Sequence, residues 1–236
     1  MKKTLVLLGM IYFCISAAQT KAITDEGKEV VLFPDKTWRY VNESDALVVE
    51  NTNTNPDLFV KAAKASFLLK STRLDAGLYV DTKIWKFQSG SNIGPFVDYI
   101  LINSASPSVM GFFSSETAPV QTLANLKDIL LMTVEKRADY FRLVTSEYRT
   151  VNGLRVLYLE YMANLKGLDF TYIGNYYLTN EGYAAALGYT FTSNFDQHRG
   201  ELTELINGIV SAKKGDSHIE VQPVKVYTNP PPPKTE

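Results

Sequence analysis

The chain has 236 residues, a formal net charge of −1 and a single cysteine, with 45% hydrophobic and 12% aromatic residues. This composition suits one sizeable packed domain with an appendage. The near-neutral charge gives no electrostatic basis for binding nucleic acid or an anionic membrane, so we expect neither as a partner.

Residues 1–22 have the layout of a secretory signal peptide. A positively charged head precedes an apolar run from Thr4 to Ile15, and small residues then offer cleavage after Ala18 or Ala22. The run is shorter than the ~20 residues that span a membrane. We therefore expect an exported protein, periplasmic or secreted, with no transmembrane helix in the mature chain.

Cys14 lies inside this segment, so the predicted mature chain has no cysteine, disulfide or thiolate site. The alternative use of Cys14 is lipidation at a lipoprotein cleavage site. That site requires a small residue before the cysteine, and Phe13 makes it unfavourable.

Two short segments precede the main domain. Residues 23–41 alternate turn signals with strand-like runs, which predicts a small β-hairpin motif or meander too small to be stable alone. Residues 42–57 are polar and rich in asparagine, which predicts a linker.

The main domain is predicted at residues 58–212, with a short helix near its start at 57–65. Hairpins are predicted from 77–81 with 84–88, and from 96–103 with 109–114. A helix follows, capped by Thr117, with leucine and valine at helical spacing up to Val134. Residues 140–149 form a predicted strand, and Asn152-Gly153 is a strong hairpin turn.

Three further strands alternate apolar and polar residues around Leu157, Tyr172 and Leu187, as antiparallel strands with one buried face do. A closing helix begins near Ser193, with Leu202, Leu205, Ile206, Ile209 and Val210 on one stripe. Residues 213–236 are polar and proline-rich, which predicts a disordered tail. The fold class is α+β: an antiparallel sheet flanked by helices, with a small N-terminal β-hairpin.

Three local segments carry a resemblance to a known fold: residues 81–87 (DTKIWKF), residues 147–153 (EYRTVNG), and Tyr176-Tyr177 with Gly182, Tyr189-Thr190 and residues 205–208 (LING). The chain resembles the PsbP-like α/β/α sandwich, within a family of uncharacterised exported bacterial proteins. Residues 23–41 are similar to a motif at the start of many bacterial envelope proteins. Known members of the fold mostly bind other proteins, so the resemblance implies an envelope protein partner.

The sequence offers little catalytic chemistry. His198 follows Asp196, but no Gly-x-Ser-x-Gly turn is present to supply a nucleophile. Glu160 and Asp169 are the carboxylates weighed for a glycosidase pair, with solvated strand charges as the simpler interpretation. A zinc site could draw on at most two imidazoles and no thiolate, and His218 falls in the polar tail. We expect no metal, no cofactor and no enzyme activity.

Tyrosines crowd the predicted meander, and those not needed for the core would form an exposed aromatic surface suited to binding. The candidate binding residues are Tyr158, Tyr172, Tyr176 and Tyr177. The predicted function is a non-catalytic protein-binding or scaffold module of the bacterial envelope. The alternatives are a periplasmic hydrolase or carbohydrate-active protein, and a carrier of an apolar ligand.

Overall fold

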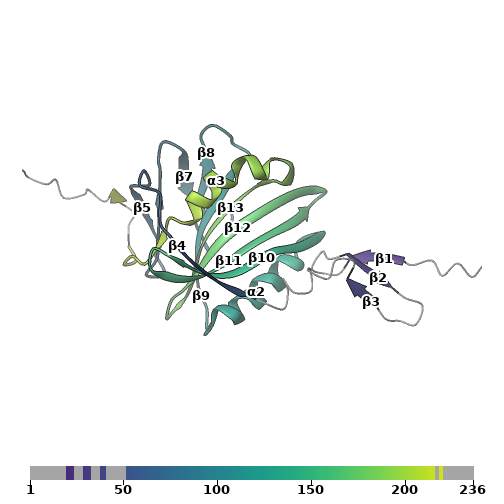
Figure 1. Cartoon of the computed structure of the whole chain (residues 1–236). Coiled ribbons are helices and arrows are strands. Elements are labelled where there is room, and N and C mark those ends of the chain that lie inside the picture. Colours follow the sequence, from purple (N-terminus) through teal and green to yellow (C-terminus); the bar gives the residue numbers. More distant parts are fainter. Residues whose placement is uncertain (1–19, 24–28, 33–37, 41–51, 216–217, 220–236) are drawn as a thin grey trace, which may run out of the picture.

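The computed structural model describes residues 20–23, 29–32, 38–40, 52–215 and 218–219. Most of the predicted signal peptide, residues 42–51 of the predicted linker and residues 220–236 of the predicted tail lie outside the described residues. Three sheets and two α-helices make up the described chain (Figure 1).

The largest sheet has eight strands in the order β4-β10-β11-β12-β13-β9-β8-β7. Their bounds are β4 (Asn53–Phe59), β7 (Trp85–Ser89), β8 (Val97–Asn103), β9 (Met110–Thr117), β10 (Tyr140–Val151), β11 (Leu154–Leu165), β12 (Leu168–Leu178) and β13 (Gly182–Phe191).

The sheet is mixed, whereas the sequence predicted an antiparallel one. All its pairs are antiparallel except β4 with β10, which is parallel. A parallel pair needs a long crossover, and here the chain makes strands and a helix between β4 and β10. The helix predicted at residues 57–65 is wrong, because β4 ends at Phe59 and residues 60–65 form no helix. Strand β4 also takes in residues 53–57 of the predicted linker.

The predicted meander is confirmed in β10 to β13, where each strand pairs with the next. Asn152 (φ 50°) and Gly153 (φ 79°) form the turn between β10 and β11. Lys166 (φ 55°) and Gly167 (φ 81°) do the same between β11 and β12. Two residues with positive φ match the right-handed twist of the strands they join.

Helix α2 (Leu123–Glu135) follows β9, as predicted, but Thr122 caps it rather than Thr117. The Thr122 hydroxyl accepts a hydrogen bond from the Asn125 N–H at 3.1 Å. Thr117 is instead the last residue of β9, where it pairs with Gly182. Because β13 is available as a partner, strand β9 continues as far as Thr117, the residue predicted to cap the helix.

Helix α3 (Phe195–Ile206) follows the 3₁₀ turn η1 (Thr192–Asn194). Ile209 and Val210, predicted on the helix stripe, form strand β14 (Ile209–Val210), which pairs with β6. The helix stops because the chain must pass β6 closely: a Cβ on Gly208 would lie only 2.1 Å from the Tyr79 carbonyl oxygen.

A second sheet has the order β14-β6-β5-β15, with β5 (Phe67–Lys70), β6 (Gly77–Val80) and β15 (His218–Ile219). The predicted hairpin of 77–81 with 84–88 is therefore wrong, because β6 pairs in this sheet and β7 pairs with β8. The Ile84 and Trp85 N–H groups both donate to the Asp81 carbonyl, and this tight turn carries the chain from one sheet to the other.

The start of the predicted tail is ordered against the second sheet. The Lys214 N–H donates to Asp75 Oδ1 at 3.0 Å, the Gly215 N–H donates to the Ser71 carbonyl at 3.0 Å, and β15 pairs with β5. Disorder therefore does not describe residues 214–215 and 218–219, since these hydrogen bonds and the pairing of β15 hold them.

The N-terminal unit is a three-stranded antiparallel sheet, the meander form of the predicted motif. It comprises β1 (Thr20–Ile23), β2 (Glu29–Leu32) and β3 (Trp38–Tyr40), in that order. β1 overlaps the end of the predicted signal peptide. Of the two predicted cleavage positions, the one after Ala18 leaves this front sheet whole.

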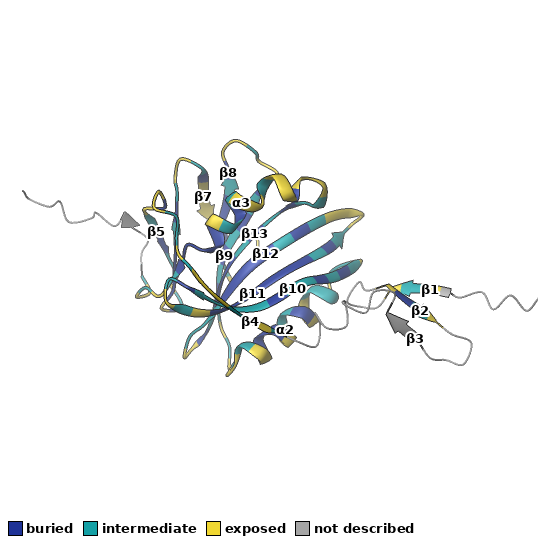
Figure 2. Ribbon diagram, in the orientation of Figure 1, coloured by how far each residue is buried: buried dark blue, intermediate teal, exposed yellow. Residues whose placement is uncertain are grey.

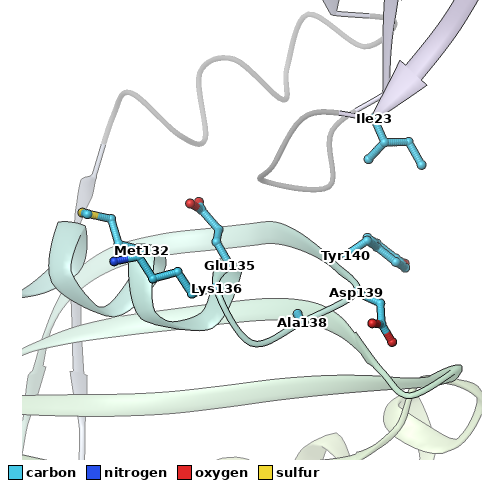
Figure 3. Close-up of a pocket in the computed structure, with 7 residues that line it drawn as sticks. All are labelled: Ile23, Met132, Glu135, Lys136, Ala138, Asp139 and Tyr140. Atoms are coloured by element: carbon cyan, nitrogen blue, oxygen red, sulfur yellow. The ribbon is translucent and has the colours of Figure 1, made fainter.

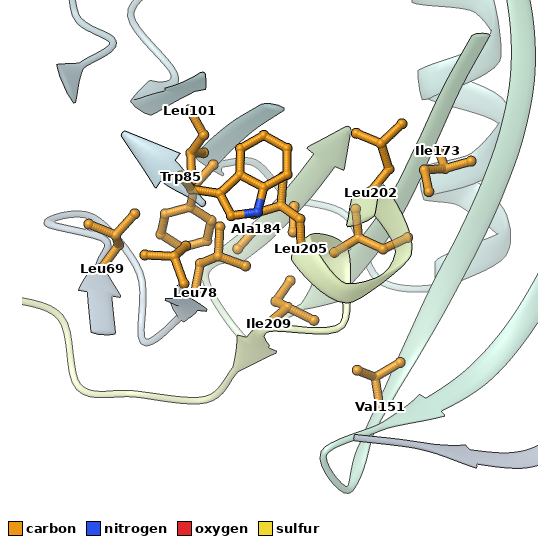
Figure 4. Close-up of a cluster of buried hydrophobic side chains, with 14 of the residues drawn as sticks. Leu69, Leu78, Trp85, Leu101, Val151, Ile173, Ala184, Leu202, Leu205 and Ile209 are labelled. Carbon is orange, nitrogen blue, oxygen red and sulfur yellow. The ribbon is translucent and has the colours of Figure 1, made fainter. Parts of the chain in front are cut away.

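The main sheet carries one hydrophobic core on each face. On one face, α3 and the second sheet pack around Trp85, Leu101, Ile173 and Leu205 (Figure 4). On the other face, α2 packs over Phe141, Leu159, Tyr161 and Tyr176. Trp85 is 4% exposed and lies in the first of these cores. Figure 2 shows buried residues along the meander strands and exposed residues on the outer sides of both helices.

Candidate functional site

The four tyrosines predicted as a binding surface do not form one surface. Tyr158 and Tyr177 face α3, whereas Tyr172 and Tyr176 face α2. Tyr158 and Tyr176 are buried, 4% and 3% exposed, while Tyr172 and Tyr177 are partly exposed. Successive strand residues point to opposite faces, which separates Tyr176 from Tyr177. Only Tyr172 belongs to the aromatic surface that the structure contains.

That surface lies on the α2 face of the sheet, where cross-strand pairing aligns side chains in rows. One row runs directly across β8, β9, β13, β12 and β11: Ile102, Met110, Tyr189, Tyr172 and Tyr161. The next row runs across the same strands: Ile100, Phe112, Leu187, Gly174 and Leu159. Every residue in both rows is uncharged. A shorter third row pairs Phe170 with Phe191.

The aromatic rings of these rows stack on one another. Ring centroids lie 5.0 Å apart for Tyr161 and Tyr172, 5.0 Å for Tyr172 and Tyr189, and 5.5 Å for Tyr189 and Phe112. The interplanar angles of these three pairs are 11°, 18° and 23°. Phe170 and Phe191 stack in the same way at 5.0 Å. Because neighbours occupy the ring faces, the rings present mainly edges and hydroxyl groups to the outside.

Helix α2 covers only one end of this stack. It packs mainly over β10 and β11, where Phe141 and Tyr161 are 0% and 6% exposed. Beyond the helix, five aromatic side chains are partly exposed: Phe112, Phe170, Tyr172, Tyr189 and Phe191. We call these five residues the aromatic face.

The tyrosine hydroxyls of the aromatic face are neutral at any physiological pH. Burial raises the pKa of Tyr172, and the neighbouring Tyr189 adds to the effect. Burial also raises the pKa of Tyr189, whose hydroxyl lies 3.2 Å from Met110 Sδ. The face therefore offers apolar area with weakly engaged hydroxyl donors and no charge, a combination enriched in protein interfaces.

On the opposite face of the sheet, charged side chains close the surface beside α3. There, Arg199 from α3 donates two hydrogen bonds to Glu160, at 2.7 and 2.9 Å, and the Tyr158 hydroxyl donates a third at 2.9 Å. The Arg149 guanidinium lies 3.4 Å from the Tyr158 ring centroid and pairs with Glu147 at 2.7 Å. These charged side chains pair with one another, so this region is less suited to binding a ligand than the aromatic face.

The other sequence candidates are not brought together. Asp196 is exposed and lies 3.6 Å from Arg199, whereas His198 faces Glu201, with Nδ1 3.5 Å from the carboxylate. Glu160 is held by Arg199, and Asp169 accepts a hydrogen bond from Asn164. Within the described part of the chain, no group of three or more His, Cys, Asp or Glu residues is placed to hold a metal.

A pocket of about 550 Å³ lies between the front sheet and the end of α2 (Figure 3). Ile23 of β1 lines it from one side, and Met132, Glu135 and Tyr140 line it from the main domain. Asp139 also lines the pocket, but its carboxylate already accepts a hydrogen bond from the Lys166 N–H. The lining mixes both charges and apolar atoms without a convergent polar set, so it defines no ligand chemistry.

The candidate residues chosen from the sequence did not include Phe112, Phe170, Tyr189 and Phe191 of the aromatic face. The alternation of aromatic residues along β12 and β13 was a usable signal, because it places Phe170 with Tyr172 and Tyr189 with Phe191 on single faces. Phe112 carries no such signal, because β9 joins the row only through its pairing with β13.

Comparison with known proteins identifies the fold. No protein-family model matches the chain, and no curated protein matches its sequence. The solution structure of CyanoP, the cyanobacterial PsbP of Synechocystis sp. PCC 6803, is similar over 64% of this chain and 95% of that chain, with a TM-score of 0.50 and 12% identity.

Two further solved structures have lower scores. PA94 of Pseudomonas aeruginosa, a protein of unknown function, aligns over 62% of this chain and 99% of its own with a TM-score of 0.42 and 12% identity. LpqN of Mycobacterium tuberculosis, involved in cell envelope biogenesis, aligns over 58% and 83% with a TM-score of 0.43 and 13% identity. The likeness to CyanoP shows the fold alone: this chain has a PsbP-like fold, with helices on both sides of a mixed sheet.

Proposed function

We propose that this chain is a non-catalytic, exported envelope protein that recognises a protein partner through its aromatic face. The observation that carries the proposal is the uncharged, partly exposed stack of Phe112, Phe170, Tyr172, Tyr189 and Phe191 beyond the edge of α2. Contiguous apolar surface of this kind, left open on a folded domain, marks interaction sites.

The geometry of the rings favours a protein partner over a carbohydrate. A sugar binds aromatic side chains by lying flat on an open ring face. Tyr172 has Tyr161 and Tyr189 on its two sides, and Tyr189 has Tyr172 and Phe112. Ring edges and hydroxyls instead suit the apolar side chains and polar rim of a protein surface.

The export part of the proposal rests on the predicted signal peptide of residues 1–22. In the described part of the chain, neither helix is long and apolar enough to cross a membrane. The mature protein would then meet its partner in the periplasm or outside the cell.

Site-specific photocrosslinking in cells that produce the full chain tests the proposal. A benzophenone amino acid replaces Tyr189 on the aromatic face, and in a matched control it replaces Glu204, which is exposed on α3. We expect a protein adduct from position 189 and none from position 204. Equal adducts at both positions, or none at 189 in a protein with unchanged Tm, would contradict the proposal.

A pair of alanine variants separates binding from stability. Tyr189→Ala should weaken capture of that partner at least tenfold, whereas Tyr177→Ala, on the opposite face, should leave it unchanged. The thermal unfolding of both variants provides the control, since each removes a partly buried ring.

A further inference from the structure

We propose that the partner segment seated on the aromatic face is an amphipathic α-helix, lying beside α2 and completing the second layer on that side of the sheet. This inference rests on the proposed function and adds the chemical form of the occupant. Four properties of the described residues support it.

The first property is that the sheet beneath the aromatic face has no free backbone. β12 pairs on both sides, with β11 and β13, and β13 pairs with β12 and β9. An extended peptide laid there would find no backbone partners and would bury its own N–H and C=O groups unpaired. A helix satisfies its backbone internally, so it can lie on this face at no such cost.

The second property is the absence of charge. The row of Ile102, Met110, Tyr189, Tyr172 and Tyr161 and the row of Ile100, Phe112, Leu187, Gly174 and Leu159 are uncharged from β8 to β11. The nearest charge along the first row is Lys86 of β7, at the edge strand. The complementary surface is an apolar stripe with polar or acidic residues along its margins. An amphipathic helix presents such a stripe on one side and polar residues on the other.

The third property is size. Strands lie about 4.8 Å apart, so β8, β9, β13 and β12 span about 15 Å, and a helix is about 10–12 Å across with its side chains. Helices pack about 8–10 Å apart, which places a second helix next to α2 over β12, β13 and β9.

The fourth property is the area, which argues against a second copy of the chain. Two rows about 7 Å apart over about 15 Å, with the shorter third row and side-chain margins, give no more than roughly 400 Å². A stable complex of two rigid proteins buries about 800 Å² on each partner. A helix reaches further than a flat contact of this size, because it can also pack along the side of α2.

The test maps where the partner is crosslinked. Benzophenone amino acids at positions 112, 189 and 191 of the full chain are irradiated in producing cells, and mass spectrometry locates each adduct within the captured partner. We expect the adducts to fall three, four and seven residues apart in one segment. A synthetic peptide of that segment should bind the mature protein, and a central proline should weaken binding at least tenfold while a proline at its first helical position does not.

Each other outcome overturns the inference. Adducts two residues apart indicate an extended segment, adducts to another molecule of this chain indicate a dimer, and adducts to lipid indicate a membrane surface. In the first case the proposed function still stands, because a protein partner has been found. Failure to obtain any protein adduct from all three positions would overturn the proposed function as well.

Discussion

Two glycines that face each other across strands β9 and β13 set how closely helix α3 approaches the sheet. Gly111 pairs directly with Gly188, and both lie beneath the helix. A Cβ on Gly111 would lie 2.5 Å from Leu205 Cδ2 and 2.7 Å from the Leu187 carbonyl oxygen. A Cβ on Gly188 would lie 2.9 Å from Leu202 Cδ2 and 3.4 Å from Leu202 Cβ.

We therefore expect Gly111→Ala to destabilise the protein by about 1–3 kcal/mol, since overpacking of a filled core costs this much. The Leu187 carbonyl belongs to the paired backbone of β13 and cannot rotate away. Gly188→Ala meets only the movable end of a leucine at under 3 Å, so its cost should fall at the lower end of the range. The order of the two variants is part of the prediction.

Gly200 supplies the matched control. It lies in the interior of α3, and a Cβ there would have nothing within 4 Å. Gly200→Ala should stabilise the protein by about 0.5–1 kcal/mol through helix propensity alone. Urea unfolding with linear extrapolation measures all three variants, and the slope should stay unchanged. Wild-type stability in Gly111→Ala would refute the proposed close approach of α3.

Three further outcomes are expected. Trp85→Ala should cost about 3–5 kcal/mol, because the ring is 4% exposed in the core; calorimetry showing an unchanged Tm would contradict this. Burial raises the pKa of Asp98 despite Ser115 and Arg73 beside it, so the stabilisation linked to its protonation is present at low pH and lost as pH rises through the folded pKa. The stability of the wild type minus that of Asp98→Asn should accordingly fall as the pH rises above the ordinary aspartate pKa of about 3.9, and a rising difference would contradict the shift. Deleting residues 213–236 should cost about 1–3 kcal/mol, because it removes the backbone bonds of Lys214 and Gly215; chemical denaturation of the truncated chain measures it, and no loss would mean these contacts contribute nothing.

The elements that the sequence predicted well are those decided by local pattern. Alternation in β11, β12 and β13, the Asn152-Gly153 turn and the periodicity of α2 all depend on residues close together in the chain.

The misplaced elements depend on partners distant in the chain. The segment of β4 reads NTNPDLF, with asparagines and Pro56 that indicate a loop. It becomes a strand because β10 offers it a free edge. A proline is tolerated there because β4 is itself the outer strand. Propensity gave way to tertiary pairing, as it does on short strands.

The candidate site was predicted in kind but not in place. Tyrosine-rich strands indicated an aromatic surface, and Tyr172 belongs to it. Strand alternation puts adjacent residues such as Tyr176 and Tyr177 on opposite faces of the sheet. The sequence does not say which of these faces α2 covers, because that depends on where the helix packs. The register that aligns Phe112 with Leu187, and so brings a β9 ring beside Tyr189, is set between strands far apart in sequence.

The order of strands also bears on how the chain reaches its fold. From Tyr140 to Phe191, four strands join through short turns, so each hairpin closes a small loop and can form on its own. β4 is separated in the chain from its partner β10 by several strands and a helix, so it can pair only after β10 has formed. Asn152 at the hairpin turn then holds the end of β4 by accepting a hydrogen bond from the Lys61 N–H at 2.8 Å. In pulse-labelled hydrogen exchange during refolding, amides of β11 and β12 should gain protection first, and those of β4 should follow with the final closure of the sheet edge.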